Sequence, residues 1–327
     1  MRASDQVWPR FVAAFTGGFF ALLGIWLMAI ILIDPYDAGY FPSLIGPGVV
    51  DDNDMTNAVG RGRDPRFDAG IFGNSHGLLI DPARLSPATG LHFVQLTVLG
   101  AGPREQLALM RYFVRRHAYV GAIVLIADQT WCTHDPALPN PWALAGYDFP
   151  YWLFGNSRWR YLAHMLSIRP WGLIRRRVLF AEGRVVPLDP AGVAEYPKSW
   201  NLALAVDMPR EPDFPLNAAQ ISTQWPAIDR LEGLMARLPR AVEIVVVMAP
   251  IYAGLLHGPD TRQGAELAAC KVRLAGALAR RGAFLDFLVD SPLSRERANF
   301  LDLHHMTPIV ARAIEPRIVE AVNNARH

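Results

Sequence analysis

The chain has 327 residues, enough to bury a hydrophobic core without help from disulfides or metals. Hydrophobic residues make up 51% and charged residues 19%, fewer charges than the roughly 25% of an average soluble domain, so part of the chain contacts lipid or is deeply buried. A net charge of +2 gives no strong long-range field, and we expect no nucleic acid or strongly acidic polymer as a partner. Cys132 and Cys270 are too few for a disulfide framework or a zinc site; a bridge between them is one option, and we expect two buried free thiols.

The first predicted element is a hydrophobic helix over Phe11–Ile33. Its residues carry no charge and, at about 1.5 Å each, form roughly 34 Å of helix, enough to cross a bilayer. A cleaved signal peptide has a shorter apolar stretch and a small-residue cleavage site, and a charge-free core helix of this length is uncommon, so we interpret the helix as a retained single-pass anchor. Arginines occur in residues 1–10, whereas Asp34 and Asp37 follow the helix. Because basic flanks prefer the cytoplasmic side, the N-terminal tail is predicted to be cytoplasmic and the main domain extracytoplasmic.

Beyond the anchor, residues 34–66 are rich in Gly, Pro, Asp and Asn and predict an irregular connector over the domain surface. Short apolar runs then alternate with amphipathic segments. The apolar runs predict strands at 67–72, 91–98, 121–127, 242–250 and 283–288. The amphipathic segments predict helices at 103–117, 225–238, 261–280 and 307–323.

This alternation predicts an α/β domain over residues 67–327, a doubly wound parallel sheet of the flavodoxin-like kind. The functional crevice of such a sheet lies at the carboxyl ends of its strands. The stretch from about 131 to 215, crowded with Pro, Trp, Arg and Tyr, interrupts the rhythm and is too long for an ordinary connection. We interpret it as an insertion that shapes substrate access, binds a partner or packs as an irregular cap.

A glycine-flanked serine follows the first predicted strand, in the sequence Gly73-Asn74-Ser75-His76-Gly77. Glycine before the serine permits the tight turn by which a strand end presents a side chain to the crevice, as in nucleophile elbows. The same hydroxyl is also able to cap the turn that follows, without any role in chemistry.

A second candidate motif precedes the last predicted helix, where Asp302 is followed by His304 and His305. An aspartate three residues before a histidine can hold one imidazole nitrogen, which fixes the tautomer so that the other nitrogen accepts a proton from a serine. The alternative is that Asp302 is a turn residue and the histidines are surface groups.

Together the two motifs resemble the SGNH, or GDSL-type, hydrolase superfamily, in which a glycine-flanked serine follows the first strand and a D-x-x-H motif precedes the final helix. The resemblance implies that Ser75 is the nucleophile, His305 the general base and Asp302 its orienter. The spacing of the family motif favours His305 over His304. It implies neither a metal nor a cofactor.

The same resemblance implies an oxyanion hole built from the N–H groups of Ser75 and Gly100, with Gly102 as a competing choice. Two positions depart from the family pattern. Asn74 stands where the family has aspartate, and the asparagine expected after the third strand is replaced by Gln129, whose amide we expect to substitute. A missing donor of this kind costs about 3 kcal/mol of transition-state stabilisation.

The segment Asp34-Pro35-Tyr36 resembles an element that follows the anchor in membrane-bound bacterial SGNH-like proteins. These resemble exported proteins that assist O-acylation of envelope polymers, such as alginate acetylation proteins and the D-alanine transfer protein of teichoic acid. The resemblance implies a bacterial cytoplasmic-membrane protein with a periplasmic domain. Its implied function is an acyl esterase or acyltransferase for an envelope glycan or lipid, with a membrane-bound acyltransferase as a candidate partner.

Two other functions are consistent with the sequence. In the first, the chain is an accessory or structural subunit of a membrane complex and the triad is idle. In the second, it is a carbohydrate-binding module that presents aromatic side chains of the insertion, namely Trp131, Trp142, Trp152 and Trp159.

Overall fold

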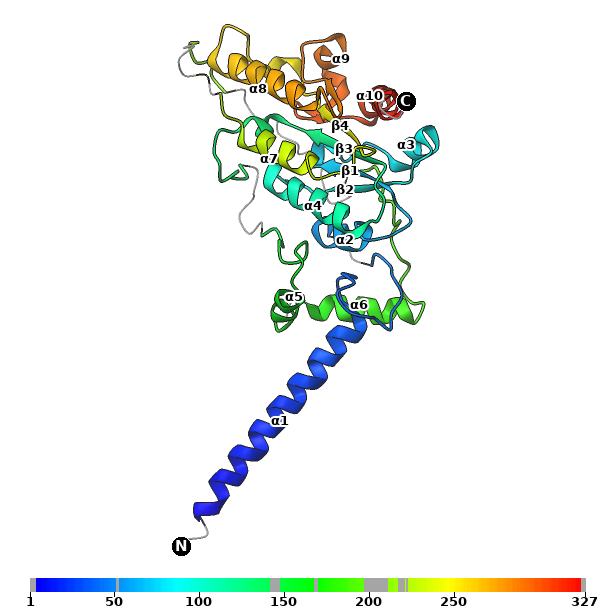
Figure 1. Cartoon of the computed structure of the whole chain (residues 1–327), viewed down its shortest axis with the longest axis vertical. Helices are drawn as coiled ribbons and strands as arrows, with labels where there is room; N and C mark the ends of the chain where they lie inside the picture. Colours follow the sequence, from blue (N-terminus) through cyan, green and yellow to red (C-terminus); the bar gives the residue numbers. More distant parts are fainter. Residues whose placement is uncertain are drawn as a thin grey trace.

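A computed structural model of the chain describes residues 4–50, 53–141, 148–167, 170–196, 211–216, 221 and 223–324. A long helix, α1 (Ser4–Ile33), projects from the base of an α/β body (Figure 1). Within Val7–Ile33, an 18-residue window has a mean hydropathy of 2.3, and only 6% of that window is buried. The helix is therefore long and apolar enough to span a membrane, a requirement that a signal sequence also meets.

The body is built on a five-stranded parallel sheet with the strand order β2-β1-β3-β4-β5. Its strands are β1 (Ala69–Gly73), β2 (Phe93–Thr97), β3 (Ala122–Ala127), β4 (Glu243–Met248) and β5 (Ala283–Asp286). The four strands β1 to β4 are buried along their whole length, which explains why their sequences are continuous apolar runs and not alternating ones. All five strands predicted from the sequence are confirmed, each within three residues at either end.

Helices cover both faces of the sheet (Figure 1). Successive strand residues point to opposite faces, so Phe72 packs with α4 and α7 while its neighbour Ile71 packs with α3 and α10. The helices after α1 are α2 (Asp54–Arg61), α3 (Pro82–Thr89), α4 (Pro103–Arg116), α5 (Arg158–Met165), α6 (Pro170–Ala181), α7 (Pro226–Met235), α8 (Arg262–Leu278), α9 (Pro292–Arg295) and α10 (Pro308–Asn324). The four helices predicted for the body correspond to α4, α7, α8 and α10, which confirms an α/β fold with a parallel sheet.

The connector 34–66 is more ordered than its composition predicted. It contains α2, which begins where the Asn53 side chain accepts hydrogen bonds from two backbone N–H groups. Its first turn is organised by Asp34, a buried carboxylate that accepts hydrogen bonds from the N–H groups of Ala38 and Gly39 and from the hydroxyl of Tyr161. The Asp-Pro-Tyr segment therefore has a structural task, the reversal of the chain where α1 ends.

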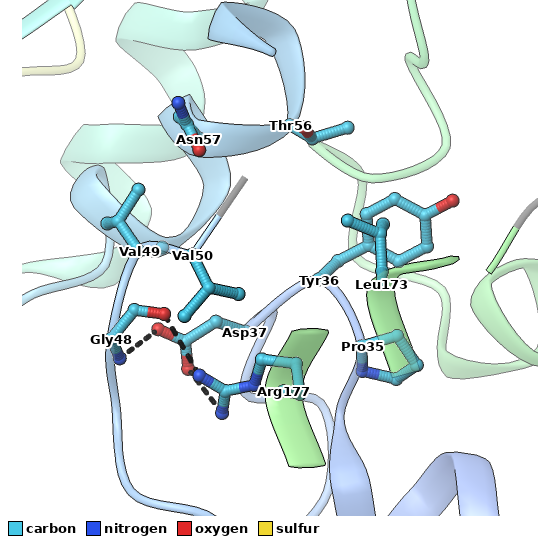
Figure 2. Close-up of a pocket in the computed structure, with 11 residues that line it drawn as sticks. Pro35, Tyr36, Asp37, Gly48, Val49, Val50, Thr56, Asn57, Leu173 and Arg177 are labelled. Carbon is cyan, nitrogen blue, oxygen red and sulfur yellow. Dashed lines mark hydrogen bonds and ion pairs between the residues drawn. The ribbon is translucent and has the colours of Figure 1, made fainter. Parts of the chain in front are cut away.

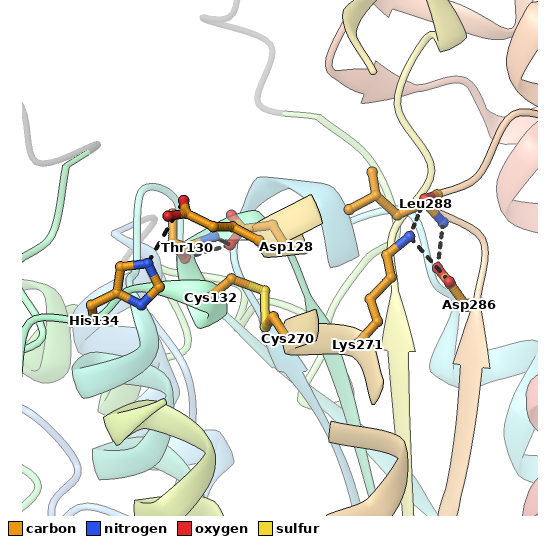
Figure 3. The surroundings of a disulfide bond; sticks show 9 residues. Asp128, Thr130, Cys132, His134, Cys270, Lys271, Asp286 and Leu288 are labelled. Carbon is orange, nitrogen blue, oxygen red and sulfur yellow. Dashed lines mark hydrogen bonds and ion pairs between the residues drawn. A yellow bond between two sulfur atoms is a disulfide. The ribbon is translucent and has the colours of Figure 1, made fainter. Parts of the chain in front are cut away.

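The expectation of two free thiols is wrong, because Cys132 and Cys270 form a disulfide (Figure 3). Cys132 ends the short 3-10 helix η2 (Gln129–Cys132) that follows β3, and Cys270 lies on the buried side of α8. The two residues are 138 positions apart, so only the pairing of β3 with β4 and the packing of α8 beside η2 bring them together.

The aromatic side chains of the insertion are mostly packing groups. Trp131 is fully buried and its Nε1 donates to Gln106 Oε1 at 2.8 Å. Trp152 stacks on His164 with 4.4 Å between ring centroids. Trp142 lies outside the described residues. Of the tryptophans proposed as a sugar platform that are described, Trp131, Trp152 and Trp159, only Trp159, at 80% exposure, is free of the core.

Candidate active site

The serine motif occupies the carboxyl end of β1, the strand between β2 and β3 in the sheet. β1 ends at Gly73, and the 3-10 helix η1 (Ser75–Gly77) begins two residues later, capped by the Asn74 side chain, which accepts from His76 N at 3.1 Å. A β-carbon on Gly73 would lie 2.8 Å from the carbonyl oxygen of Ile126 on β3. Glycine is therefore required at position 73 by the close approach of β3, and this approach sets where the next residues emerge.

A small antiparallel hairpin before α10 carries the other two candidate residues. Asp302 ends β6 (Phe300–Asp302), and His305 opens β7 (His305–Met306). The Asp302 carboxylate accepts the backbone N–H of His305 at 2.8 Å, which holds the two residues in one turn. The hairpin contacts η1, so two motifs separated by 230 residues meet at one edge of the sheet.

Ser75, His305 and Asp302 form a continuous chain of hydrogen bonds. Ser75 Oγ lies 2.8 Å from His305 Nε2, and His305 Nδ1 lies 2.7 Å from both carboxylate oxygens of Asp302. His305, not His304, is the histidine that contacts the serine. The side chains of His305 and Asp302 are 16% and 17% exposed, so these hydrogen bonds are shielded but not fully closed off from solvent.

The charge of Asp302 fixes the tautomer of His305. Burial alone would raise the pKa of Asp302, but the hydrogen bonds and charge of His305 outweigh it and hold that pKa below its usual value. An ionised carboxylate accepts the Nδ1 proton of the neutral ring. His305 Nε2 is then an acceptor for the Ser75 hydroxyl, the arrangement that proton transfer from a serine requires.

Asn74 contacts Asp128, the residue that directly follows β3. Asn74 Nδ2 donates to Asp128 Oδ2 at 2.6 Å, and both side chains are buried. Asp128 Oδ1 also accepts from Thr130 N at 2.9 Å, so this carboxylate caps η2 as Asn74 caps η1. The pair links the turns after β1 and β3. Sequence reasoning missed it, because the contact depends on β1 and β3 being neighbours in the sheet.

His76 is a second histidine beside the first. Its ring meets the His305 ring edge to face, with 5.2 Å between centroids, and its Nδ1 is buried without a hydrogen-bond partner among the described residues. Burial lowers the pKa of His76 to about 4, and the neighbouring His305 acts in the same direction. His76 is therefore neutral at pH 7 and adds no positive charge next to His305.

Two backbone N–H groups are available near Ser75 for a developing negative charge. For the N–H groups of Ser75 and Gly100, no acceptor is found within the described part of the chain. Gly100 has a φ of 67° and forms the turn after β2, a conformation that favours glycine. The competing choice, Gly102, donates its N–H to Glu105 Oε2 at 2.9 Å, so Gly100 is the better candidate.

Gln129 and Asn140 are two further amide side chains near these turns. Gln129 is exposed, and no hydrogen bond of its side chain to a described residue is found; its role as an oxyanion donor stays a prediction. The Asn140 side chain reaches Gly100 from the insertion and donates Nδ2 to its carbonyl oxygen at 2.6 Å. This contact steadies the peptide that follows β2. No sequence pattern pointed to Asn140, because it lies in an irregular segment.

Tyr196 brings the far end of the insertion to the site. Its hydroxyl donates to Met306 O at 3.0 Å, and its ring lies edge to face with the His305 ring, 6.1 Å away between centroids. Burial and the charge of Asp302 raise the pKa of Tyr196 well above its usual value, so the phenol stays neutral and covers one side of His305.

We expect Gly73→Ala to destabilise the protein by about 1–3 kcal/mol, because a backbone carbonyl cannot move aside for the new methyl group. The measurement is the free energy of unfolding in urea. Gly276→Ala is the matched control: this exposed position in α8 has no atom within 4 Å of the added carbon, and the change should stabilise by up to about 1 kcal/mol. Equal stabilities for the two variants would contradict the close approach of β3.

Within the described residues, no group of three or more His, Cys, Asp or Glu side chains has an arrangement that suits a metal ion. No family model matches the chain, and no curated protein matches it significantly.

Proposed function

We propose that this chain is an SGNH-like serine esterase or O-acyltransferase, held outside a bacterial cytoplasmic membrane by α1 and acting on an acyl ester of an envelope glycan or lipid. The observation that carries the proposal is the hydrogen-bonded chain from Ser75 Oγ through His305 to Asp302. The strand order and the helices on both faces support a flavodoxin-like, doubly wound sheet, with the triad at the carboxyl ends of its strands.

Acylation of Ser75 is the first step. His305 Nε2 takes the hydroxyl proton as Ser75 Oγ bonds to the ester carbonyl carbon, whose oxygen becomes an oxyanion. The N–H groups of Ser75 and Gly100 are the proposed donors to that oxyanion. The intermediate collapses when the bond to the alcohol oxygen breaks, and that oxygen leaves with the proton held by His305. The product is an acyl-Ser75 ester.

The second step decides between hydrolysis and transfer. His305 takes a proton from water or from a glycan hydroxyl as that oxygen bonds to the acyl carbon. The bond from the acyl carbon to Ser75 Oγ then breaks, and Oγ takes the proton held by His305, which restores the serine. Water gives an esterase, whereas a hydroxyl acceptor gives a transferase. The acyl group comes from a donor in the same bilayer, which α1 makes accessible. This donor is either a lipid ester or a membrane-bound acyltransferase partner.

The disulfide supports an extracytoplasmic location. Structural disulfides persist in oxidising compartments and are rare where thiols are kept reduced. Cys270 is fully buried, so the bridge belongs to the folded core and not to an exposed redox site. Together with the arginines before α1 and the aspartates after it, the bridge favours an orientation with the body outside.

The test of the chemistry is capture of Ser75. We expect a fluorophosphonate to modify one residue of the full-length protein, and peptide mass spectrometry should place the adduct on Ser75, because only a serine paired with a base reacts quickly. In a folded His305→Gln variant the rate of modification should fall at least about 100-fold. Adducts elsewhere, or equal rates in both proteins, would contradict the proposal.

Asp302→Asn tests the orienter. The NH2 group of the asparagine side chain can donate to His305 Nδ1, and that nitrogen is then unprotonated. The ring proton is then on Nε2, which faces the serine. We expect kcat for a p-nitrophenyl ester to fall about 10³- to 10⁴-fold with little change in KM. Circular dichroism and the unfolding midpoint control for folding. A fall below tenfold in the folded variant would show that Asp302 does not set the tautomer.

A further inference from the structure

Helices α5 and α6, both from the insertion, lie across the base of the body where α1 joins it (Figure 1). The Trp26 ring of α1 stacks on Trp171 of α6 with 4.2 Å between centroids. Trp26 Nε1 also donates to Met165 O, at the end of α5, at 3.3 Å. The end of α5 and the start of α6 are therefore fixed at the height of Trp26 along α1.

When α1 spans a bilayer, helix geometry sets the depth of Trp26 in the hydrocarbon core. A hydrocarbon core of about 30 Å needs about 20 helical residues, so a span that begins after Arg10 ends near Ile30. Trp26 then lies about 6 Å inside the outer edge of the core. Ile30 is itself fully buried in the body. The base of the body thus reaches the membrane interface and does not stand above it.

The outward face of α5 is apolar. Trp159 and Leu166, seven residues apart and so on one side of the helix, are 80% and 55% exposed. On the opposite side Tyr161 and Met165 are buried against the body. Exposed tryptophan and leucine on one face are typical of a helix that lies in a membrane interface.

α6 repeats this pattern. Trp171 and Val178, again seven residues apart, are exposed, while Arg177, on another side of the helix, is fully buried. Arg177 holds the helix in place: its Nη1 donates to Gly48 O at 2.9 Å, its Nη2 to Gly46 O at 3.0 Å, and Asp37 lies 3.7 Å away (Figure 2). The outward face of α6 is therefore presented by a rigid support.

The charge of this segment suits an anionic surface. Residues 156–181 contain six arginines and no aspartate or glutamate, although the whole chain is nearly balanced. Of these, Arg158, Arg160 and Arg175 are exposed beside the outward tryptophans. Arginine binds phosphate through several donors, and its stem packs on apolar surface while the guanidinium reaches the headgroups.

We propose that α5 and α6 form a membrane platform, defined by residues 158–167 and 170–181, whose outward face lies at the boundary between the headgroups and the acyl chains of an anionic bilayer. This inference rests on the proposed membrane span of α1. It goes beyond anchoring, because a single helix tethers a domain without orienting it, whereas a platform fixes which way the body faces.

The test uses the full-length protein in vesicles of phosphatidylcholine and phosphatidylglycerol, with one added cysteine carrying a spin label. Both native cysteines are in the disulfide, so the added thiol is the only one free to react. Labels are placed by Trp159→Cys and Leu166→Cys on the platform, by Leu22→Cys in α1, and by Val272→Cys, an exposed position on α8. Collision with oxygen reports lipid, and collision with a water-soluble nickel chelate reports water.

We expect nickel accessibility at positions 159 and 166 to be at least about threefold lower than at 272, with the label at 22 the most protected. Omitting phosphatidylglycerol should raise nickel accessibility at 159 and 166. Platform labels as accessible as position 272, with position 22 in lipid, would overturn the platform alone. A label at 22 in water would overturn the anchor and the platform together, and lack of any effect of phosphatidylglycerol would overturn the anionic preference. None of these results depends on turnover at Ser75, so they are separate from failure of the proposed chemistry.

Discussion

The Ser75→Ala variant is expected to fold like the wild type and to lose at least about 10³-fold in kcat for ester turnover. The change removes one oxygen, whose single hydrogen bond within the described residues is to His305 Nε2, and leaves the backbone N–H of residue 75 in place. Because the nucleophile and the base act as a unit, Ser75→Ala, His305→Ala and the double variant should lose nearly the same factor. The measurement is steady-state turnover of a p-nitrophenyl ester by the detergent-solubilised, full-length chain.

His304→Ala is the matched comparison, since it removes an imidazole next to the proposed base. We expect kcat to change less than about tenfold, because His305 holds both Ser75 and Asp302 without it. If His304→Ala abolished turnover while His305→Ala did not, the assignment of the base would be wrong. Full turnover in Ser75→Ala would sink the acyl-serine mechanism and favour an accessory role with an idle triad.

The sheet was predictable from sequence for a physical reason. A parallel strand covered on both faces is apolar at every position, so runs such as those at β3 and β4 are visible without knowledge of their partners. The helices that pack on the sheet show a periodic apolar stripe. α3 escaped prediction although Asp81, Pro82 and Gly90 supply a cap, a first-turn proline and a left-handed end, because its eight residues carry little periodicity.

The triad was predictable to the extent that its members are local motifs. Asp302 and His305 are three residues apart, and Ser75 follows a strand, so each half is visible in sequence. The contacts that join or support the two halves were not predictable from the sequence. The Asn74 bond to Asp128 spans 54 residues, and Asn140 and Tyr196 reach the site from irregular parts of the insertion. Contacts of this kind depend on the three-dimensional order of the strands.

Removal of the disulfide is expected to have the largest effect on stability. In the chain-entropy account, a bridge across 138 residues restricts the unfolded chain, and its loss costs about 2–5 kcal/mol. We expect the Cys132→Ser, Cys270→Ser double variant to unfold at a clearly lower urea concentration than the wild type. Wild-type protein reduced before unfolding should match the double variant, which separates loss of the bridge from the effect of the new hydroxyls.

The position of the Cys132–Cys270 disulfide links the stability of the fold to the turn that carries Ser75. Cys132 ends η2, the turn that Asp128 begins, and Asp128 holds Asn74 beside Ser75. Without the bridge, η2 loses its covalent link to α8, so Asp128 should lose part of its restraint. We therefore expect the double variant to lose ester turnover at a lower temperature than that of its global unfolding, whereas in the wild type the two losses should coincide. Coincident losses in both proteins would show that the bridge stabilises the fold as a whole and has no separate influence on Ser75.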